Sequence, residues 1–123
     1  MAPAPAREWI AGLEILGMRF GLERMEALLA ALDHPQRVAP ALHIVGTNGK
    51  SSTARLASTA LAAHGRRVGT YLSPHVTDWT ERIQVQGQPL DEGRFTAAVD
   101  AVREACAGLA LPDGDAVTQF EAL

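Results

Sequence analysis

The sequence predicts an α/β fold built on a parallel βαβ unit with a phosphate-binding turn. The run "ALHIV" at residues 41–45 is short, apolar and partly β-branched, as a buried strand requires. A glycine-rich turn follows, and a helical pattern runs from about Lys50 to His64. A second strand is predicted at Arg67–Leu72, and the crossover between the two strands is expected to be right-handed. Two strands are too few for an open sheet, so the predicted sheet is incomplete.

Two helices are expected before this unit. Residues 1–6 alternate Ala and Pro and predict a disordered lead. From residue 7 onward, apolar residues recur at helical spacing, and Gly17 is expected to end the first helix. A second helix ends before Pro35. Its apolar positions are Leu22, Met25, Leu28, Leu29 and Leu32.

The elements after the unit are shorter. Residues 73–82 predict a polar loop, and residues 82–90 predict a hairpin in which Gly87 permits a tight turn. Asp91 is a suitable N-cap for a helix that carries Phe95, Val99 and Val102 on one face. The last eight residues, "AVTQFEAL", predict the start of another helix.

Composition excludes several classes of protein. The chain has 123 residues, 47% apolar and 20% charged, with a net charge of −3, which indicates an ordinary soluble protein without a basic nucleic-acid-binding face. A single cysteine, Cys106, leaves no disulfide framework and no cysteine-rich metal site. There is no signal-peptide pattern and no run near the ~20 apolar residues of a membrane span. We therefore expect an intracellular, cytoplasmic protein, either one domain or a piece of a larger one.

The turn "GTNGKS" supplies what a bound phosphate needs. A glycine-rich turn that opens a helix offers backbone N–H donors without obstructing side chains, and the helix dipole favours an anion. Lys50 adds a positive charge, and Ser51 lies where a hydroxyl could reach Mg²⁺. The common motif G-x-x-x-x-G-K would place glycine at Ile44, whereas the first glycine here is Gly46. The alternative is a tight turn that carries a surface lysine.

The sequence resembles a known family in four separated motifs. "GTNGKSST" is similar to the phosphate loop of the Mur ligase superfamily, although Ser51 stands where glycine is frequent. "GTYLSPHVTDWTERIQVQGQPL" resembles folylpolyglutamate synthases, including the forms that are also dihydrofolate synthases. "FGLERM" and "TQFEAL" match two further family segments in the same order. The resemblance implies that residues 7–123 are the N-terminal portion of a Mur-ligase-like ATP-binding domain.

The resemblance also implies a reaction. An ATP-dependent ligase of folate biosynthesis and one-carbon metabolism would convert a carboxylate into an acyl phosphate, which the amine of glutamate then attacks. The implied cofactors are ATP and Mg²⁺, and the implied acceptors are a folate or dihydropteroate. We expect no nucleic-acid or membrane partner, and a monomer as the complete protein.

The resemblance implies a role for specific residues. Lys50 is the implied catalytic residue, and Ser73 the implied Mg²⁺ ligand. The implied contacts to the ATP phosphates are Gly46, Thr47, Asn48, Gly49, Lys50 and Ser51. The implied contacts to the pterin are Met18, Arg19, Phe20, Thr118, Gln119, Phe120 and Glu121.

Several of these residues keep a second interpretation. Phe20 and Phe120 have a second interpretation as core residues. His75 is either a polar loop residue or a catalytic one, and Trp79 either closes over a substrate or fastens its own loop. Cys106 is expected to be buried and inert.

The family's remaining machinery is expected beyond residue 123. It comprises a glutamate and a histidine that bind Mg²⁺, a carbamylated lysine, and a second domain that closes over ATP and glutamate. The chain by itself is therefore predicted to be at best a weak nucleotide-binding piece. Two alternatives remain: another ligase of the superfamily that acts on a different carboxylate, and a non-catalytic module that retained the loop.

Overall fold

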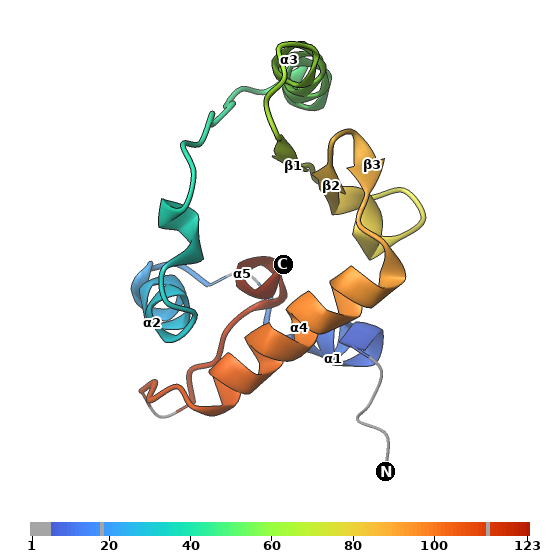
Figure 1. Cartoon of the computed structure of the whole chain (residues 1–123). Coiled ribbons are helices and arrows are strands. Elements are labelled where there is room, and N and C mark those ends of the chain that lie inside the picture. Colours follow the sequence, from blue (N-terminus) through green and yellow to red (C-terminus); the bar gives the residue numbers. More distant parts are fainter. Residues whose placement is uncertain (1–5, 18, 113) are drawn as a thin grey trace. The chain divides into compact units, whose positions relative to one another are not determined.

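The computed structural model describes residues 6–17, 19–112 and 114–123, and it divides the chain into two compact units (Figure 1). The first unit consists of Met1–Pro40 and Thr96–Leu123, and the second of Ala41–Phe95. Of the predicted disordered lead, residues 1–5 lie outside the described residues, whereas Ala6 is buried and is the first residue of a helix. The first unit is therefore assembled from the two ends of the sequence.

The first unit is helical. Its elements are α1 (Ala6–Gly12), a 3₁₀ turn (Leu13–Leu16), α2 (Glu23–Ala31), a second 3₁₀ turn (Pro35–Arg37), most of α4 (Glu92–Ala107) and α5 (Gln119–Ala122). Gly17 follows the first 3₁₀ turn with a φ of +61°, so the helical segment ends where predicted, although the α-helix itself already ends at Gly12. The buried apolar side chains of this unit include Ile10, Leu28 and Val99.

The second unit combines one helix with a small antiparallel sheet. Its elements are α3 (Lys50–Ala63), β1 (Gly69–Tyr71), a 3₁₀ turn (Trp79–Arg82), β2 (Ile83–Val85) and β3 (Gln88–Pro89). The strand order is β1-β2-β3, with Tyr71 opposite Ile83 and Gln84 opposite Pro89. Gln86 and Gly87 join β2 to β3 with φ values of +51° and +76°, as a tight hairpin turn demands. The predicted hairpin is confirmed.

The predicted parallel strand pair requires correction. Residues 41–46 form no strand, and β1, which lies within the predicted strand Arg67–Leu72, pairs antiparallel with β2. Leu42 and Val45 are 69% and 78% exposed. β-Branched and apolar residues favour a strand because they fit a half-buried pleated surface, and a segment without a neighbouring strand has no such surface. The crossover helix therefore exists without the parallel pair that was expected to flank it.

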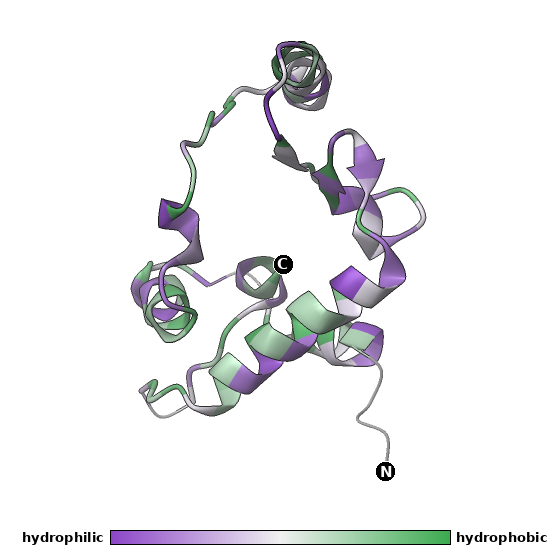
Figure 2. Cartoon of the chain, viewed as in Figure 1, coloured by the Kyte–Doolittle hydropathy of each residue, from purple (hydrophilic) through white to green (hydrophobic). Residues whose placement is uncertain are grey.

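The helices differ in how far their predicted apolar faces are buried. In α4, Phe95 and Val99 are almost fully buried, as the spacing predicted, and hydrophobic and hydrophilic residues alternate along its ribbon (Figure 2). In contrast, α3 has no buried residue, and its Leu61 is 42% exposed. None of the helices in the described part of the chain is both long and apolar enough to cross a membrane.

Candidate functional site

The predicted phosphate loop forms the entrance to α3. Gly49 is the N-cap residue of this 14-residue helix and adopts the left-handed conformation, with a φ of +73°. The Thr53 N–H and hydroxyl both donate to the Gly49 carbonyl, at 2.9 and 2.8 Å. The first helical hydrogen bond thus begins at Thr53, which leaves the N–H groups of residues 50–52 pointing ahead of the helix. This is the donor arrangement that binds anions at helix N-termini.

The loop is exposed to solvent and carries one cationic side chain, Lys50. All six residues from Gly46 to Ser51 are exposed. Lys50 is the only lysine in the sequence; the other ten basic residues are arginines. A side-chain ammonium at the first position of the helix and three forward-facing N–H groups form one electropositive surface. The six residues predicted to contact ATP are therefore contiguous and accessible.

The loop that follows Ser73 is held by a carboxylate. Glu81 accepts hydrogen bonds from the N–H groups of Val76, Thr77 and Asp78, at 2.9, 3.0 and 2.9 Å, and from the Thr77 hydroxyl. The hydrogen bond from the Thr77 side chain, together with those from the backbone, lowers the pKa of Glu81 from 4.5 to about 2. Glu81 is therefore ionised at neutral pH and ties down the backbone of its own loop.

Three side chains fasten the same loop from a second direction. Arg82 donates from Nε to Nδ1 of His75 at 2.8 Å, and its guanidinium lies 5.2 Å from the centroid of the Trp79 ring. The His75 and Trp79 rings are 4.4 Å apart. Because Nδ1 accepts this hydrogen bond, the neutral imidazole carries its proton on Nε2. Trp79 thus has the contacts of a residue that fastens the loop, which was one of its two interpretations.

A metal site is only partly represented. Ser51 and Ser73 are exposed and offer hydroxyl oxygens, which are hard donors of the type Mg²⁺ accepts. Among the residues that the structure describes, no three His, Cys, Asp or Glu side chains gather into a metal-binding group. The hydroxyls fit a Mg²⁺ ion that also has phosphate and water ligands, and they are insufficient without these.

The two predicted pterin segments are brought together by a residue that the sequence analysis did not assign. Arg24 of α2 donates from Nε to both carboxylate oxygens of Glu121, each at 3.2 Å. It also donates from Nη1 to Asp115 at 3.2 Å. From Nη2 it reaches the carbonyl oxygens of Arg19 and Phe20, at 3.1 and 3.3 Å. One side chain therefore connects residues that lie 91 and 97 positions away in the sequence.

Most of the predicted pterin residues are engaged in this fold. Thr118 is the N-cap of α5 and forms a reciprocal capping box with Glu121, and Gln119 donates to the Ile10 carbonyl at 3.0 Å. Arg19 pairs with Asp115 at 3.1 Å. Two side chains of the set project outward instead, Phe20 with 91% and Phe120 with 70% of its surface exposed. Met18, the remaining predicted contact, lies outside the described residues.

The exposure of the two rings removes one earlier alternative. Phe20 and Phe120 are not core residues of this chain, because core side chains lose nearly all their exposed surface. Both are attached to backbone that the Arg24 network holds. The structure therefore presents two phenyl rings on anchored segments.

The ionised groups of this network stabilise one another in their charged forms. Hydrogen bonding to Glu121 raises the pKa of Arg24 against the effect of burial. Burial raises the pKa of Asp115 and of Glu121, but hydrogen bonds from Arg24 and from neighbouring N–H groups outweigh it, so both values are lowered. Arg24 retains only 6% and Glu121 11% of its side-chain exposure. The network is thus a charged group centred on the nearly buried pair of Arg24 and Glu121.

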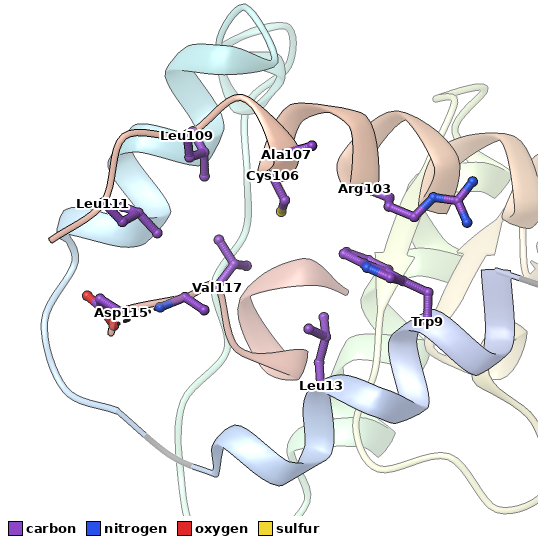
Figure 3. A pocket seen from close by; sticks show the side chains of 10 residues that line it. Trp9, Leu13, Arg103, Cys106, Ala107, Leu109, Leu111, Asp115 and Val117 are labelled. Atoms are coloured by element: carbon purple, nitrogen blue, oxygen red, sulfur yellow. Dashed lines mark hydrogen bonds between the residues drawn. The ribbon is translucent and has the colours of Figure 1, made fainter. Parts of the chain in front are cut away.

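A cavity of about 390 Å³ in the first unit adjoins this network, because Asp115 is one of its lining residues (Figure 3). Trp9 and Leu13 line one side, Cys106 and Ala107 of α4 another, and Val117 lies between them. Cys106 is half-buried, and burial raises the pKa of its thiol. A protonated, partly shielded thiol is poorly reactive, which agrees with the inert role expected for this residue.

Curated relatives of the chain are described as dihydrofolate synthases, folylpolyglutamate synthases or both. No family model matches it. It is 38% identical over 116 residues to the dihydrofolate synthase/folylpolyglutamate synthase of Bacillus subtilis, a match that covers 94% of this chain and 27% of the relative. The enzyme of the same name from Escherichia coli is 36% identical over 113 residues, which cover 89% of this chain and 27% of that protein. The chain thus spans about a quarter of the length of these relatives.

Solved structures agree. The folylpolyglutamate synthetase from Lactobacillus casei superposes with a TM-score of 0.85 at 34% identity, over 97% of this chain and 31% of that one. A complex of a folylpolyglutamate synthase with AMPPCP and folate gives a TM-score of 0.83 at 33% identity, over 97% of this chain and 30% of that one. The similarity covers both units of the chain, including the small antiparallel sheet.

Proposed function

We propose that this chain, which is homologous to the N-terminal part of folylpolyglutamate synthases and dihydrofolate synthases, supplies two sites to an ATP-dependent glutamate ligase. The loop at Gly46–Ser51 binds the phosphates of ATP, and the segments around Phe20 and Phe120 bind the pterin end of the acceptor. The complete protein joins the amine of glutamate to the carboxylate of a folate or dihydropteroate, in the cytoplasm.

The observation that carries the proposal is the entrance to α3. Three helix N–H groups, an ammonium and a glycine with positive φ occur within the seven contiguous exposed residues 46–52. Phosphoryl transfer depends on positioning and on neutralising charge, and these groups provide both. Support for a nucleotide site comes from this turn and from the relatives, since the flanking parallel strands are not formed.

The chemistry follows from the groups at the turn. An acceptor carboxylate oxygen attacks the γ-phosphorus, the bond to ADP breaks, and the glutamate amine then displaces phosphate from the acyl carbon as it loses a proton. Lys50 stabilises the negative charge that develops on the transferred phosphoryl group. Mg²⁺, when bound, would further neutralise the phosphate charge, and the Ser51 and Ser73 hydroxyls are the oxygens of this chain suited to hold it.

The acceptor side is suited to a flat ring. Phe20 and Phe120 offer aromatic faces on anchored backbone, and stacking on one such face contributes roughly 0.5–1.5 kcal/mol beyond burial. The runner-up is a ligase of the same superfamily that acts on another carboxylate, for which the phosphate loop would be equally suitable. The two exposed phenyl rings favour the pterin.

Acceptor specificity of the complete protein tests the proposal. Incubation with ATP, Mg²⁺ and glutamate should release ADP and phosphate only when dihydropteroate or tetrahydrofolate is added, and mass spectrometry should show an added glutamate. A sugar-nucleotide carboxylate serves as the competing acceptor. Turnover with that acceptor and none with either pterin would refute the folate assignment while leaving the ligase chemistry intact.

A further inference from the structure

We infer that Arg24 is a positioning residue for the acceptor, which holds the two segments that carry Phe20 and Phe120 at a fixed separation. The inference rests on the proposed function, because it concerns how the acceptor side of that site is built. It also assigns Glu121 to the anchor of the site instead of to the surface that contacts the pterin.

The Arg24 guanidinium links the two segments directly, because it binds backbone carbonyls of the first and a carboxylate of the second. Its Nη2 binds the Arg19 and Phe20 carbonyls at 3.1 and 3.3 Å, which fixes the segment before α2. Its Nε binds Glu121 at 3.2 Å, which fixes the segment that forms α5. All three nitrogens of Arg24 are engaged, so a change in this side chain is transmitted to both segments.

Glu121 has little capacity left for a ligand. Its Oε1 accepts from Arg24, and its Oε2 accepts from the N–H and the hydroxyl of Thr118, at 2.8 and 2.9 Å. A carboxylate offers about four lone-pair directions, and these contacts use most of them. With 11% of its side chain exposed, Glu121 faces Arg24 and the α5 N-terminus.

Asp115 completes the anchor from a third position. It accepts from Arg24, from Arg19 at 3.1 Å and from the Ala116 N–H at 3.0 Å. Arginine suits such a centre because its planar fork presents donors in several fixed directions, whereas lysine presents three donors at one point. The geometry therefore demands arginine itself and not merely a positive charge.

Anchoring matters because an aromatic surface assembled from two segments must be ordered before it can bind well. If the segments moved independently, the acceptor would have to order them, and that entropy would be subtracted from its affinity. Arg24 binds the backbone carbonyl of Phe20 itself, and Phe120 directly precedes Glu121, whose carboxylate Arg24 also binds. Each ring is thus at most one residue from a group that Arg24 holds.

The test uses the complete protein and the variant Arg24→Lys, which keeps the charge and loses the fork. We expect the KM for dihydropteroate or tetrahydrofolate to rise about tenfold, since small misplacements of binding groups cost affinity steeply. The KM for ATP and kcat at saturating acceptor should stay within about twofold. Arg94→Lys is the matched control, because Arg94 forms an exposed ion pair with Asp91 at 3.3 Å.

A double-mutant cycle with Glu121→Gln separates an anchor from a direct contact. If Glu121 acts through Arg24, the variant that combines Glu121→Gln with Arg24→Lys should be no worse than the poorer single variant, because both remove one connection. If the increases in acceptor KM caused by the two substitutions multiply in the double variant, Glu121 contacts the acceptor itself, and its assignment to the anchor is overturned. Glu121→Gln retains an oxygen for the α5 cap, so it is expected to fold.

Two other results would overturn the inference. An equal rise in the KM for ATP and for the acceptor would show a general structural defect, as would a lowered thermal midpoint with unchanged KM values. In either case the wild-type protein would still ligate glutamate to the pterin substrate. Failure of the proposed function is distinct, because the wild-type protein itself would then show no pterin-dependent turnover.

Discussion

The phosphate loop and the Arg24 network are built in opposite ways. The loop is contiguous and exposed, and its internal hydrogen bonds connect residues four positions apart, Thr53 to Gly49. The network is charged and centred on a nearly buried ion pair, which connects Arg24 with Glu121 across 97 positions. Each arrangement suits the ligand proposed for it.

The contrast between the loop and the network predicts which step of the reaction a mutation in each should impair. A phosphate is recognised by backbone donors and one cation, and a helix start supplies these without a surrounding core. A flat ring is recognised by the separation of side chains on different segments, which only tertiary contacts can set. Changes in the loop should therefore impair catalysis, and changes in the network should impair acceptor binding.

The largest effect is expected from Lys50→Ala in the complete protein. Loss of one group that stabilises transition-state charge should lower kcat by more than about two orders of magnitude, or roughly 2.7 kcal/mol of barrier. Steady-state kinetics measure it, with circular dichroism to confirm the fold. Arg55→Ala, one turn further along α3, is the control. Turnover near that of the wild type in Lys50→Ala would remove the phosphate-loop assignment.

A smaller effect is expected when the backbone of the loop is strained. Gly49→Val places a β-branched residue at a φ of +73° and should cost about 1–2 kcal/mol of stability. Gly12→Ala in α1 is the control from the other unit, where φ is −62° and an added Cβ would meet no atom within 4 Å. Chemical denaturation should show destabilisation only for Gly49→Val. Equal midpoints would show that the left-handed turn is not required.

Phe120→Ala tests the acceptor side without disturbing its anchor. The ring is 70% exposed, so its removal should leave the thermal midpoint unchanged. Loss of one stacking face, roughly 0.5–1.5 kcal/mol, should raise the KM for the pterin substrate about two- to tenfold. The KM for ATP should not move. A change confined to the KM for ATP would contradict the division of labour between the two regions.

The smallest effect concerns pH and the loop after Ser73. Glu81 has a pKa of about 2 when folded and 4.5 ordinarily, so its stabilising contribution is complete above pH 4.5 and is lost as pH falls toward 2. NMR of the Val76 and Thr77 amide protons should therefore show a transition centred near pH 2. Glu81→Gln should abolish it. A midpoint near 4.5 in the wild-type chain would mean that the loop is not held by this carboxylate.

Local patterns were interpreted correctly where they are self-sufficient. Gly17 follows the first 3₁₀ turn with a positive φ, Gly87 forms the hairpin turn, and Asp91 caps α4 by accepting from the Arg94 N–H at 3.0 Å. Each feature depends on residues within a few positions of it. The chemistry of a cap or a turn is thus already contained in the adjacent sequence.

The wrong predictions have a common cause, because each depends on contacts with segments that are distant in the sequence. "ALHIV" has the composition of a strand, but strand formation needs a second strand, and residues 41–46 have none in the described structure. The apolar spacing of α2 predicted burial of Leu22, which is 70% exposed, whereas Arg24 is 5% exposed. Periodicity assigns faces by hydrophobicity, so it overlooks a charged side chain that is buried because its partners are charged.

What the sequence determined by itself is the set of short-range devices: the glycine turn that opens α3, the single lysine beside it, the helix caps and the hairpin. What only the tertiary structure decided is which distant segments meet, namely that Arg24 joins Phe20 to the segment of Phe120, and which rings stay exposed. The physical reason is that a helix cap or a tight turn depends only on hydrogen bonds and backbone angles of residues that are adjacent in the sequence. Burial of a charge, by contrast, is favourable only when all its partners arrive together.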